Sequence, residues 1–358
     1  MKILIVNAIL YTNETHEVKK VESIKDTMIY DLCIAFNKAG HEVTLLAAED
    51  YKPTADEEYP FEIVWAKAKF KKLFPANILP CCTAVKRIVR ENNFDLIISS
   101  EVFSLNSFML VSGGAKDKVI IWQELAKHNN LMHKLPSKFW YNIVARLFYR
   151  NVTVVARSEE AREFISKYCA NVSDKIIDHG VNLDKFTPCK EKENYFIIPS
   201  QLIARKQIDR SIEAFAEFAE GKDFYLYIFG EGDEEANLKK YASSLGVADK
   251  IRFFGKAPHE TLKEYMAKAQ AMLIYTRQDN NMVSVIEAIA CGTPIVTTSV
   301  PYNSAYIDST KLGIVNDSWG AADLEEIVNN NAYYVNNCLN YRDELSDGRR
   351  VEQFLELI

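Results

Sequence analysis

Short apolar runs bounded by turn residues recur along the whole chain and alternate with segments of helical periodicity. An apolar run without polar alternation is typical of a strand in a parallel sheet, which is buried on both faces. These runs predict strands at residues 3–6, 43–47, 63–65, 96–99, 119–122 and 152–156, and then at 196–199, 225–229, 251–254, 271–275 and 295–298. The segments between them predict helices at 27–39, 209–220, 234–245, 259–269, 283–291 and 349–358. The alternation predicts an α/β protein with parallel sheets covered by helices.

The chain has 358 residues, which is long for a single hydrophobic core. The stretch from 178 to 192 is rich in turn residues and is the predicted domain boundary. We therefore expect an N-terminal domain at 1–180, a second domain at 181–345, and a C-terminal helix within 346–358 that packs back towards the first domain.

Composition narrows the class of protein. Hydrophobic residues make up 48% of the chain and charged residues 26%, as in soluble globular enzymes. A net charge of −6 argues against a general nucleic-acid binder. The seven cysteines include no Cys-x-x-Cys pair, which favours a reduced, cytoplasmic protein. Neither His-Glu-x-x-His nor Asp-x-Asp occurs, so no metal ligand set is predicted.

The segment from 279 to 298 carries the most specific pattern. Asp279 precedes a predicted helix and Glu287 lies on its second turn. The first turn of a helix has backbone N–H groups without intrahelical acceptors, and its positive dipole end favours an anion such as a diphosphate. A carboxylate on the same helix suits a neighbouring diol, such as a ribose. Gly292 and Pro294 then end the helix before the strand at 295–298.

Two earlier segments fit the same chemistry. Arg205 and Lys206 stand between a predicted strand and the helix at 209–220, at the edge of a parallel sheet where ligands bind in such folds. Gly230 and Gly232 follow another strand and form either an ordinary turn or a place of close ligand approach.

In this order, the motifs resemble those of the large family of retaining glycosyltransferases with the Glu-x7-Glu motif, known as group 1 or family 4. The matching segments are 178–186 (Asp-His-Gly-Val-Asn-Leu-Asp-Lys-Phe), 200–206 with Asp209, 229–232, 253–255 and 279–287. The resemblance is specific from about residue 178 to 300 and weaker before it. It implies the GT-B fold, in which two Rossmann-like domains with parallel sheets face a central cleft.

The resemblance also implies roles for individual residues. Those implied near the reacting groups are Asp279, Lys206, Glu124 and His128. Those implied to bind the nucleotide sugar are Glu287 at the ribose, with Arg205, Gln201, Gly230, Lys256, Met282, Val283 and Ser284.

The sequence departs from the family pattern in several places. Gln201 stands where the family has an arginine, and Asp279 stands where it has a longer glutamate. Asn7 to Leu10 replace a glycine pair, and Gln123 occupies the place of a histidine.

The resemblance implies transfer of a hexosyl group from a nucleotide diphosphate sugar, UDP- or GDP-linked, to a hydroxyl of a lipid-linked or polysaccharide precursor. Retention at the anomeric carbon and independence of metals and other cofactors are expected. A nucleotide-sugar epimerase, a sugar phosphorylase and a catalytically silent scaffold for a partner transferase remain as alternatives.

Two basic, aromatic stretches of the first half, 67–90 and 125–157, contain no acidic residue. One interpretation is peripheral docking on the inner face of the cell membrane, an anionic surface. The other is that the aromatic residues belong to the core and the cations to a solvated face.

Overall fold

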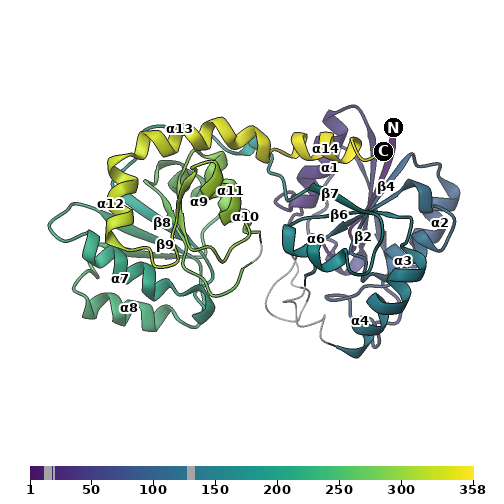
Figure 1. The fold of residues 1–358 in the computed structure, drawn as a ribbon, viewed down its shortest axis with the longest axis horizontal. Helices are drawn as coiled ribbons and strands as arrows, with labels where there is room; N and C mark the ends of the chain where they lie inside the picture. The colour runs from purple at the N-terminus through teal and green to yellow at the C-terminus, as the bar shows by residue number, and fades with distance from the viewer. Residues whose placement is uncertain (12–17, 19–20, 127–133, 280) are drawn as a thin grey trace. The chain divides into compact units, whose positions relative to one another are not determined.

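The computed structural model describes residues 1–11, 18, 21–126, 134–279 and 281–358, and it divides into two compact units (Figure 1). Unit 1 comprises Met1–Gly180 together with Asp347–Ile358, and unit 2 comprises Val181–Ser346. The chain thus leaves unit 1 after Gly180 and returns to it with its last helix.

Unit 1 is built on a seven-stranded parallel sheet in the order β3-β2-β1-β4-β5-β6-β7. Its strands are β1 (Lys2–Val6), β2 (Glu42–Ala48), β3 (Glu62–Ala66), β4 (Leu96–Ser100), β5 (Val119–Gln123), β6 (Thr153–Ala156) and β7 (Val172–Ile176). Strand β1, in the interior of the sheet, is almost wholly buried, because helices cover both faces of the sheet.

The helices of unit 1 include α1 (Met28–Lys38), α2 (Ala84–Glu91), α3 (Leu105–Val111), α6 (Glu159–Ile165) and α14 (Asp347–Leu355). Between α3 and α6, one continuous helix is formed by α4 (Leu135–Phe139), η4 (Trp140–Ala145) and α5 (Arg146–Phe148). Short 3-10 turns are η1 (Glu49–Tyr51) and η2 (Lys116–Lys118). The Thr27 hydroxyl caps α1 by accepting the Tyr30 N–H. Helix α14 packs on α1, with the rings of Phe36 and Phe354 6.2 Å apart. The C-terminal helix therefore belongs to the first unit.

Unit 2 has a six-stranded parallel sheet in the order β10-β9-β8-β11-β12-β13. Its strands are β8 (Tyr195–Pro199), β9 (Tyr225–Phe229), β10 (Ile251–Gly255), β11 (Met272–Leu273), β12 (Ile295–Thr297) and β13 (Gly313–Val315). Its helices are α7 (Ile208–Phe218), α8 (Glu235–Ser244), α9 (His259–Lys268), α10 (Val283–Ala290), α11 (Ser304–Ser309), α12 (Ala321–Asn329) and α13 (Asn331–Tyr341). The 3-10 turns are η5 (Leu183–Lys185), η6 (Ala204–Lys206) and η7 (Arg342–Leu345).

The two faces of this second sheet carry separate cores. Successive residues of β8 point to opposite sides, as the pleat of a strand requires. Phe196 and Ile198 pack with α7, α8 and α12, whereas Tyr195 and Ile197 pack with α9, α10 and α13. Unit 2 is therefore a three-layer α/β sandwich.

Both sheets reverse their order of strand addition next to the first strand of the unit, between β1 and β4 and between β8 and β11. In open parallel sheets, ligands bind beyond the carboxyl ends of the strands at such a switch point. The topology therefore marks one candidate site in each unit.

The predicted α/β architecture with parallel sheets is confirmed. The strand predicted at 271–275 is shorter and spans Met272–Leu273. Pattern analysis did not predict the edge strands β7 and β13, nor helices α2, α3, α4, α6, α11, α12 and α13. In the described part of the chain, every helix is too short or too polar to cross a bilayer.

Candidate functional site

In unit 2, the chain leaves β8 at the switch point and forms the turn η6 before entering α7. Gln207 adopts a left-handed conformation, with φ of 42°, between the turn and the helix. This sharp junction ends η6 at Lys206, whose side chain is only 11% exposed. Gln201, at the start of the same connection, is exposed to solvent.

Asp279 brings the two predicted cations together. The Lys206 Nζ lies 2.8 and 3.0 Å from the two carboxylate oxygens of Asp279, and Arg205 Nη1 lies 3.1 Å from Oδ1. The Thr276 hydroxyl also donates to Asp279 Oδ2, at 2.8 Å. Two cationic groups and one hydroxyl thus surround a single carboxylate that is 12% exposed. Residues 73 and 74 positions apart in sequence meet here because β8 and β11 are neighbours in the sheet.

The N-terminus of α10 lies in the segment that follows Asp279. The amides of Val283 and Ser284 belong to the first helical turn and have no intrahelical acceptor. The amide of Met282 differs, because it donates to the side-chain oxygen of Asn303. Asn303, which is fully buried, thus fixes the residue preceding the helix. Sequence analysis did not identify this asparagine.

Glu287 lies on α10 with its side chain only 14% exposed. Its Oε1 is 3.0 Å from Nε2 of His259, the first residue of α9. The ring of His259 in turn packs edge-on against Phe186, with 6.2 Å between centroids. Sequence analysis did not single out His259, because nothing in the local pattern around it differs from a helix start at the surface.

The glycine turn after β9 has a packing explanation. A Cβ on Gly230 would lie 1.9 Å from the Ser200 carbonyl oxygen, and one on Gly232 would lie 2.2 Å from the Leu202 carbonyl oxygen. Gly230 also has a φ of 130°, which side chains disfavour. These glycines allow the turn to approach the backbone after β8. Lys256, after β10, is exposed.

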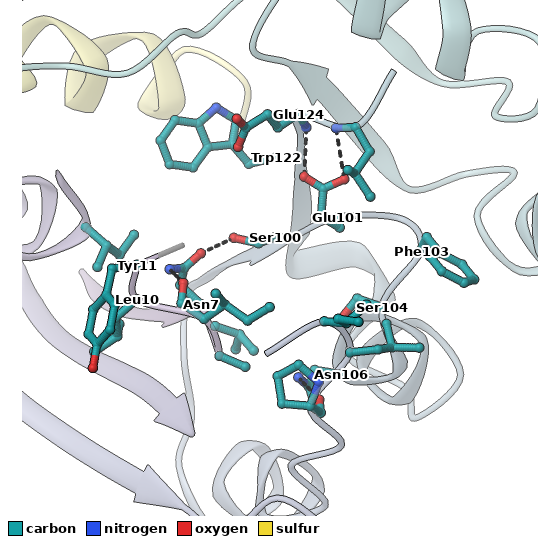
Figure 2. A pocket seen from close by; sticks show the side chains of 18 of the residues that line it. Asn7, Leu10, Tyr11, Ser100, Glu101, Phe103, Ser104, Asn106, Trp122 and Glu124 are labelled. Atoms are coloured by element: carbon teal, nitrogen blue, oxygen red, sulfur yellow. Dashed lines mark hydrogen bonds between the residues drawn. The ribbon is translucent and has the colours of Figure 1, made fainter. Parts of the chain in front are cut away.

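Unit 1 contains a pocket of about 380 Å³ at its own switch point (Figure 2). The Ser100 hydroxyl, at the end of β4, donates to the Asn7 side-chain oxygen after β1, so the two strands are tied together at the pocket. Apolar side chains form much of the lining, including Ile9, Leu10, Ile78, Leu79, Phe103 and Leu125.

Glu101 forms part of the pocket wall and has a left-handed backbone, with φ of 68°. Its two carboxylate oxygens accept the amides of Glu124 and Leu125, at 2.8 and 3.2 Å. Figure 2 draws these bonds as dashed lines from Glu101. Burial raises the pKa of Glu101 to about 7, and the charge of Glu124 adds to this effect while Arg157 opposes it. Glu101 thus anchors the connection after β5.

Glu124, predicted to lie near the reacting groups, forms the polar side of the same pocket. Its Oε2 is 2.8 Å from Arg157 Nη1, and its Oε1 is 4.0 Å from His179 Nε2. The guanidinium of Arg157 stacks on Trp122, 3.7 Å from the ring centroid. Trp122 and Arg157 thus fix one oxygen of Glu124 by a charge-assisted bond.

The other predicted residues of this region have different outcomes. Gln123 is fully buried and bonds to the Val102 amide and the Leu125 carbonyl, so its role is structural. His128 lies outside the described residues. Glu101, His179 and the Asn7–Ser100 pair were missed by sequence analysis. The available signal for Glu101 was an acidic residue placed directly after a buried strand.

Two models of known protein families match this chain. Residues 182–331 match the model described as glycosyl transferases group 1, and residues 26–185 match glycosyltransferase family 4. Lipopolysaccharide glucosyltransferase WaaG from Escherichia coli is 29% identical over 142 residues, covering 39% of this chain and 37% of WaaG. Alpha-monoglucosyldiacylglycerol synthase from Streptococcus pneumoniae is 28% identical over 189 residues, covering 48% and 42%. The aligned regions span less than half of these relatives.

Solved structures match over nearly the whole chain. Sucrose-phosphate synthase from Thermosynechococcus elongatus has a TM-score of 0.68 at 16% identity, covering 99% of this chain and 98% of the other. Anabaena HepE in complex with UDP-glucose has a TM-score of 0.62 at 15% identity, with both chains fully covered. At these identities the match establishes the architecture alone.

Proposed function

Because this chain belongs to the group 1 and family 4 glycosyltransferases and has their GT-B fold, we propose that it transfers a hexosyl group from a UDP- or GDP-sugar to a hydroxyl of a lipid-linked or polysaccharide precursor. The observation that carries the proposal is the cluster of Lys206, Arg205 and Asp279 at the switch point of unit 2, next to the N-terminus of α10. The donor binds there, and the pocket of unit 1 takes the acceptor.

The diphosphate of the donor is held by the two cations and by the amides of Val283 and Ser284. Lys206 contributes most, since a hydrogen bond to a charged group is worth about 1.5–3 kcal/mol. The helix terminus adds about 0.3–1 kcal/mol and directs the phosphate. Negative charge develops on the diphosphate as the bond to the sugar breaks, and these fixed positive groups stabilise it. A metal ion is not required in this scheme.

Asp279 serves two purposes in the proposed complex. Its carboxylate holds Lys206 and Arg205 in position by the bonds that exist without a donor. It also lies close to the sugar and accepts hydrogen bonds from its hydroxyl groups.

Glu287 binds the hydroxyl groups of the ribose. Its contact with His259 fixes one carboxylate oxygen and leaves the other for the diol. Because the side chain is largely buried, its orientation is established before the nucleotide arrives. This preorganisation lowers the entropic cost of binding.

On the acceptor side, Glu124 orients the attacking hydroxyl by accepting its hydrogen bond. The contacts with Arg157 and His179 place this carboxylate at the polar side of a pocket whose other walls are mainly apolar. Such a pocket suits an acceptor that presents a hydroxyl next to an apolar group. We propose retention of the anomeric configuration, as in the family that the motifs resemble.

A donor screen tests the proposal directly. Thermal unfolding is measured with UDP-, GDP- and ADP-sugars, for the wild type and for Glu287→Ala. One donor class raises the Tm of the wild type, and Glu287→Ala weakens that effect. Glu264→Ala, on the neighbouring helix α9, serves as the control, and the donor raises its Tm as much as that of the wild type. If no nucleotide sugar shifts the Tm of the wild type, the proposal is wrong.

Two further measurements test its finer points. Transfer assayed with excess EDTA proceeds at the untreated rate if no metal is needed. The coupling constant of the anomeric proton in the product, measured by NMR, matches that of the donor if the configuration is retained. An inverted product would contradict retention and leave the transferase assignment intact.

A further inference from the structure

The continuous helix formed by α4, η4 and α5 has an apolar outer face. Leu135, Phe139, Ile143 and Leu147 are 82%, 59%, 45% and 69% exposed. They follow one another at intervals of four residues, so they form a single stripe. Exposed apolar side chains that gather in one stripe mark an interaction surface.

The opposite face of this helix explains why the stripe is regular. Ser137, Tyr141, Ala145 and Tyr149 are buried, again at intervals of four. The central segment Trp140–Ala145 is a π-helix, which has more residues per turn than an α-helix. Joined to α-helical turns on both sides, it gives an average repeat close to four. Inner and outer faces therefore stay separate along the whole helix.

The charged side chains of this helix and its flanking residues all have the same sign. Lys134, Lys138 and Arg150 are exposed beside it, and no acidic residue occurs from 125 to 157. A helix with an apolar face flanked by basic residues lies in the interface of anionic membranes.

The basic stretch 67–90 is an alternative contact surface, but an acidic residue from another segment lies beside one of its cations. Phe70 and Leu73 are exposed there. Lys71, however, forms an ion pair with Asp50, so an acidic group offsets the central cation. The helix 135–148 has the clearer combination of apolar and basic side chains.

The helix is connected to the pocket of unit 1 by aromatic contacts. Trp140 donates its indole N–H to the Val102 carbonyl, at 2.8 Å, and its ring meets Phe103 edge-on at 5.5 Å. Phe103 lines the pocket. The helix is thus tied to the pocket wall through Trp140 and Phe103.

We propose that the face formed by Leu135, Phe139, Ile143 and Leu147 docks on an anionic lipid bilayer. The apolar side chains enter the boundary between headgroups and acyl chains, and Lys134, Lys138 and Arg150 contact the anionic headgroups. This inference goes beyond sugar transfer, which needs no membrane.

The test is sedimentation of the full chain with phosphatidylcholine vesicles, with and without phosphatidylglycerol, in the absence of donor and acceptor. The wild type binds only the anionic vesicles, and high salt weakens the binding. Replacing both Phe139 and Leu147 by Ser reduces the affinity at least about tenfold. Replacing Lys134 and Lys138 by Glu reduces it about 30-fold or more. All these side chains are exposed, so circular dichroism and the Tm stay unchanged.

Matched controls separate this face from other surfaces. Tyr333→Ser removes an exposed aromatic residue of unit 2 and leaves vesicle binding unchanged. Lys69→Glu combined with Lys72→Glu reverses two cations of the stretch 67–90 and has a smaller effect than the change at Lys134 and Lys138.

Three results would overturn the proposal. The first is that the wild type fails to bind anionic vesicles. The second is that the Lys69 and Lys72 variant loses as much affinity for anionic vesicles as the Lys134 and Lys138 variant, or more. The third is a self-associating wild type that becomes monomeric in the Phe139 and Leu147 variant while its vesicle binding persists, because the face would then be an interface between copies of the chain.

Discussion

The two units place different chemistry at the same position of the same topology. In unit 2, the switch point between β8 and β11 carries Lys206, Arg205 and Asp279 in one cluster of charges. In unit 1, the switch point between β1 and β4 carries the neutral Asn7–Ser100 pair and a largely apolar pocket. In the proposed function, the topology sets where a ligand binds, and the residues that follow the strands decide which ligand it is.

The charged groups of the two sites are also stabilised in different ways. Unit 2 holds two cations against a single carboxylate through hydrogen bonds and ion pairs. In unit 1, Arg157 lies between the Trp122 ring and Glu124 and is almost completely buried. A flat guanidinium stacked on a ring keeps a fixed orientation.

The largest expected effect comes from removing the main cation of unit 2. Lys206→Ala lowers kcat/KM about 10- to 150-fold, since a charge-assisted hydrogen bond to the diphosphate is lost. Steady-state kinetics and calorimetry with the donor measure the change. Lys240→Ala, an exposed lysine on α8, is the control and keeps wild-type values. A Lys206 variant with normal kinetics would exclude this lysine from the donor site.

A second variant tests whether unit 1 acts on the acceptor alone. Glu124→Gln keeps the shape of the side chain and removes its charge, so the acceptor hydroxyl loses a strong hydrogen-bond partner. We expect kcat/KM for the acceptor to fall about tenfold. Donor affinity, measured by calorimetry, stays the same. Loss of donor affinity in this variant would show that the functions of the two units are not divided as proposed.

A third variant tests the pairing of charges in unit 2. Asp279→Asn leaves Lys206 and Arg205 without their carboxylate, so free UDP or GDP binds about fivefold more tightly because one nearby negative charge is gone. Transfer falls at the same time, since the contact with the sugar is weakened. Asp308→Asn, an exposed residue of α11, changes neither property. Unchanged affinity for the free nucleotide would mean that Asp279 does not compete with the diphosphate.

The sequence predicts most of unit 2 because its strands are continuous apolar runs and its motifs lie within single segments. The edge strand β7 escaped the same reasoning, since Val172–Ile176 has three consecutive polar residues between its apolar ends and none of its residues is buried. The continuous helix formed by α4, η4 and α5 escaped it because its average repeat of about four residues fits neither the α-helical nor the strand period.

Contacts between distant segments limit the prediction of the sites. Lys206, Asp279 and Glu287 were each identified from a local pattern, and the structure shows what each contacts. The pairing of Glu287 with His259 depends on how α9 packs on α10, and no local pattern encodes it. Glu101 was missed for the same reason, because its partners are backbone amides on the neighbouring strand connection.

The last expected effect concerns the pH dependence of stability and separates Glu101 from the other acidic residues. Burial raises the pKa of Glu101 to about 7 in the folded chain, whereas in the unfolded chain a glutamate titrates at about 4.3. The folded state therefore binds more protons between these two values, and stability decreases as the pH rises through this window.

The protonated carboxyl is favoured by burial, and two backbone amides that donate to the ionised form oppose it. We expect the stability of the wild type to fall by about 2 kcal/mol between pH 5 and pH 7 relative to Glu101→Gln, whose side chain does not titrate. Denaturant unfolding at both pH values measures this difference.

Glu160 is an exposed residue of α6, and Glu160→Gln serves as the control that keeps the pH dependence of the wild type. If the stability of Glu101→Gln depended on pH as that of the wild type does, Glu101 would be ionised throughout this range. In that case the pocket of unit 1 would carry a permanent second negative charge beside Glu124, and the contrast between this largely apolar pocket and the charged cluster of unit 2 would be weaker than proposed.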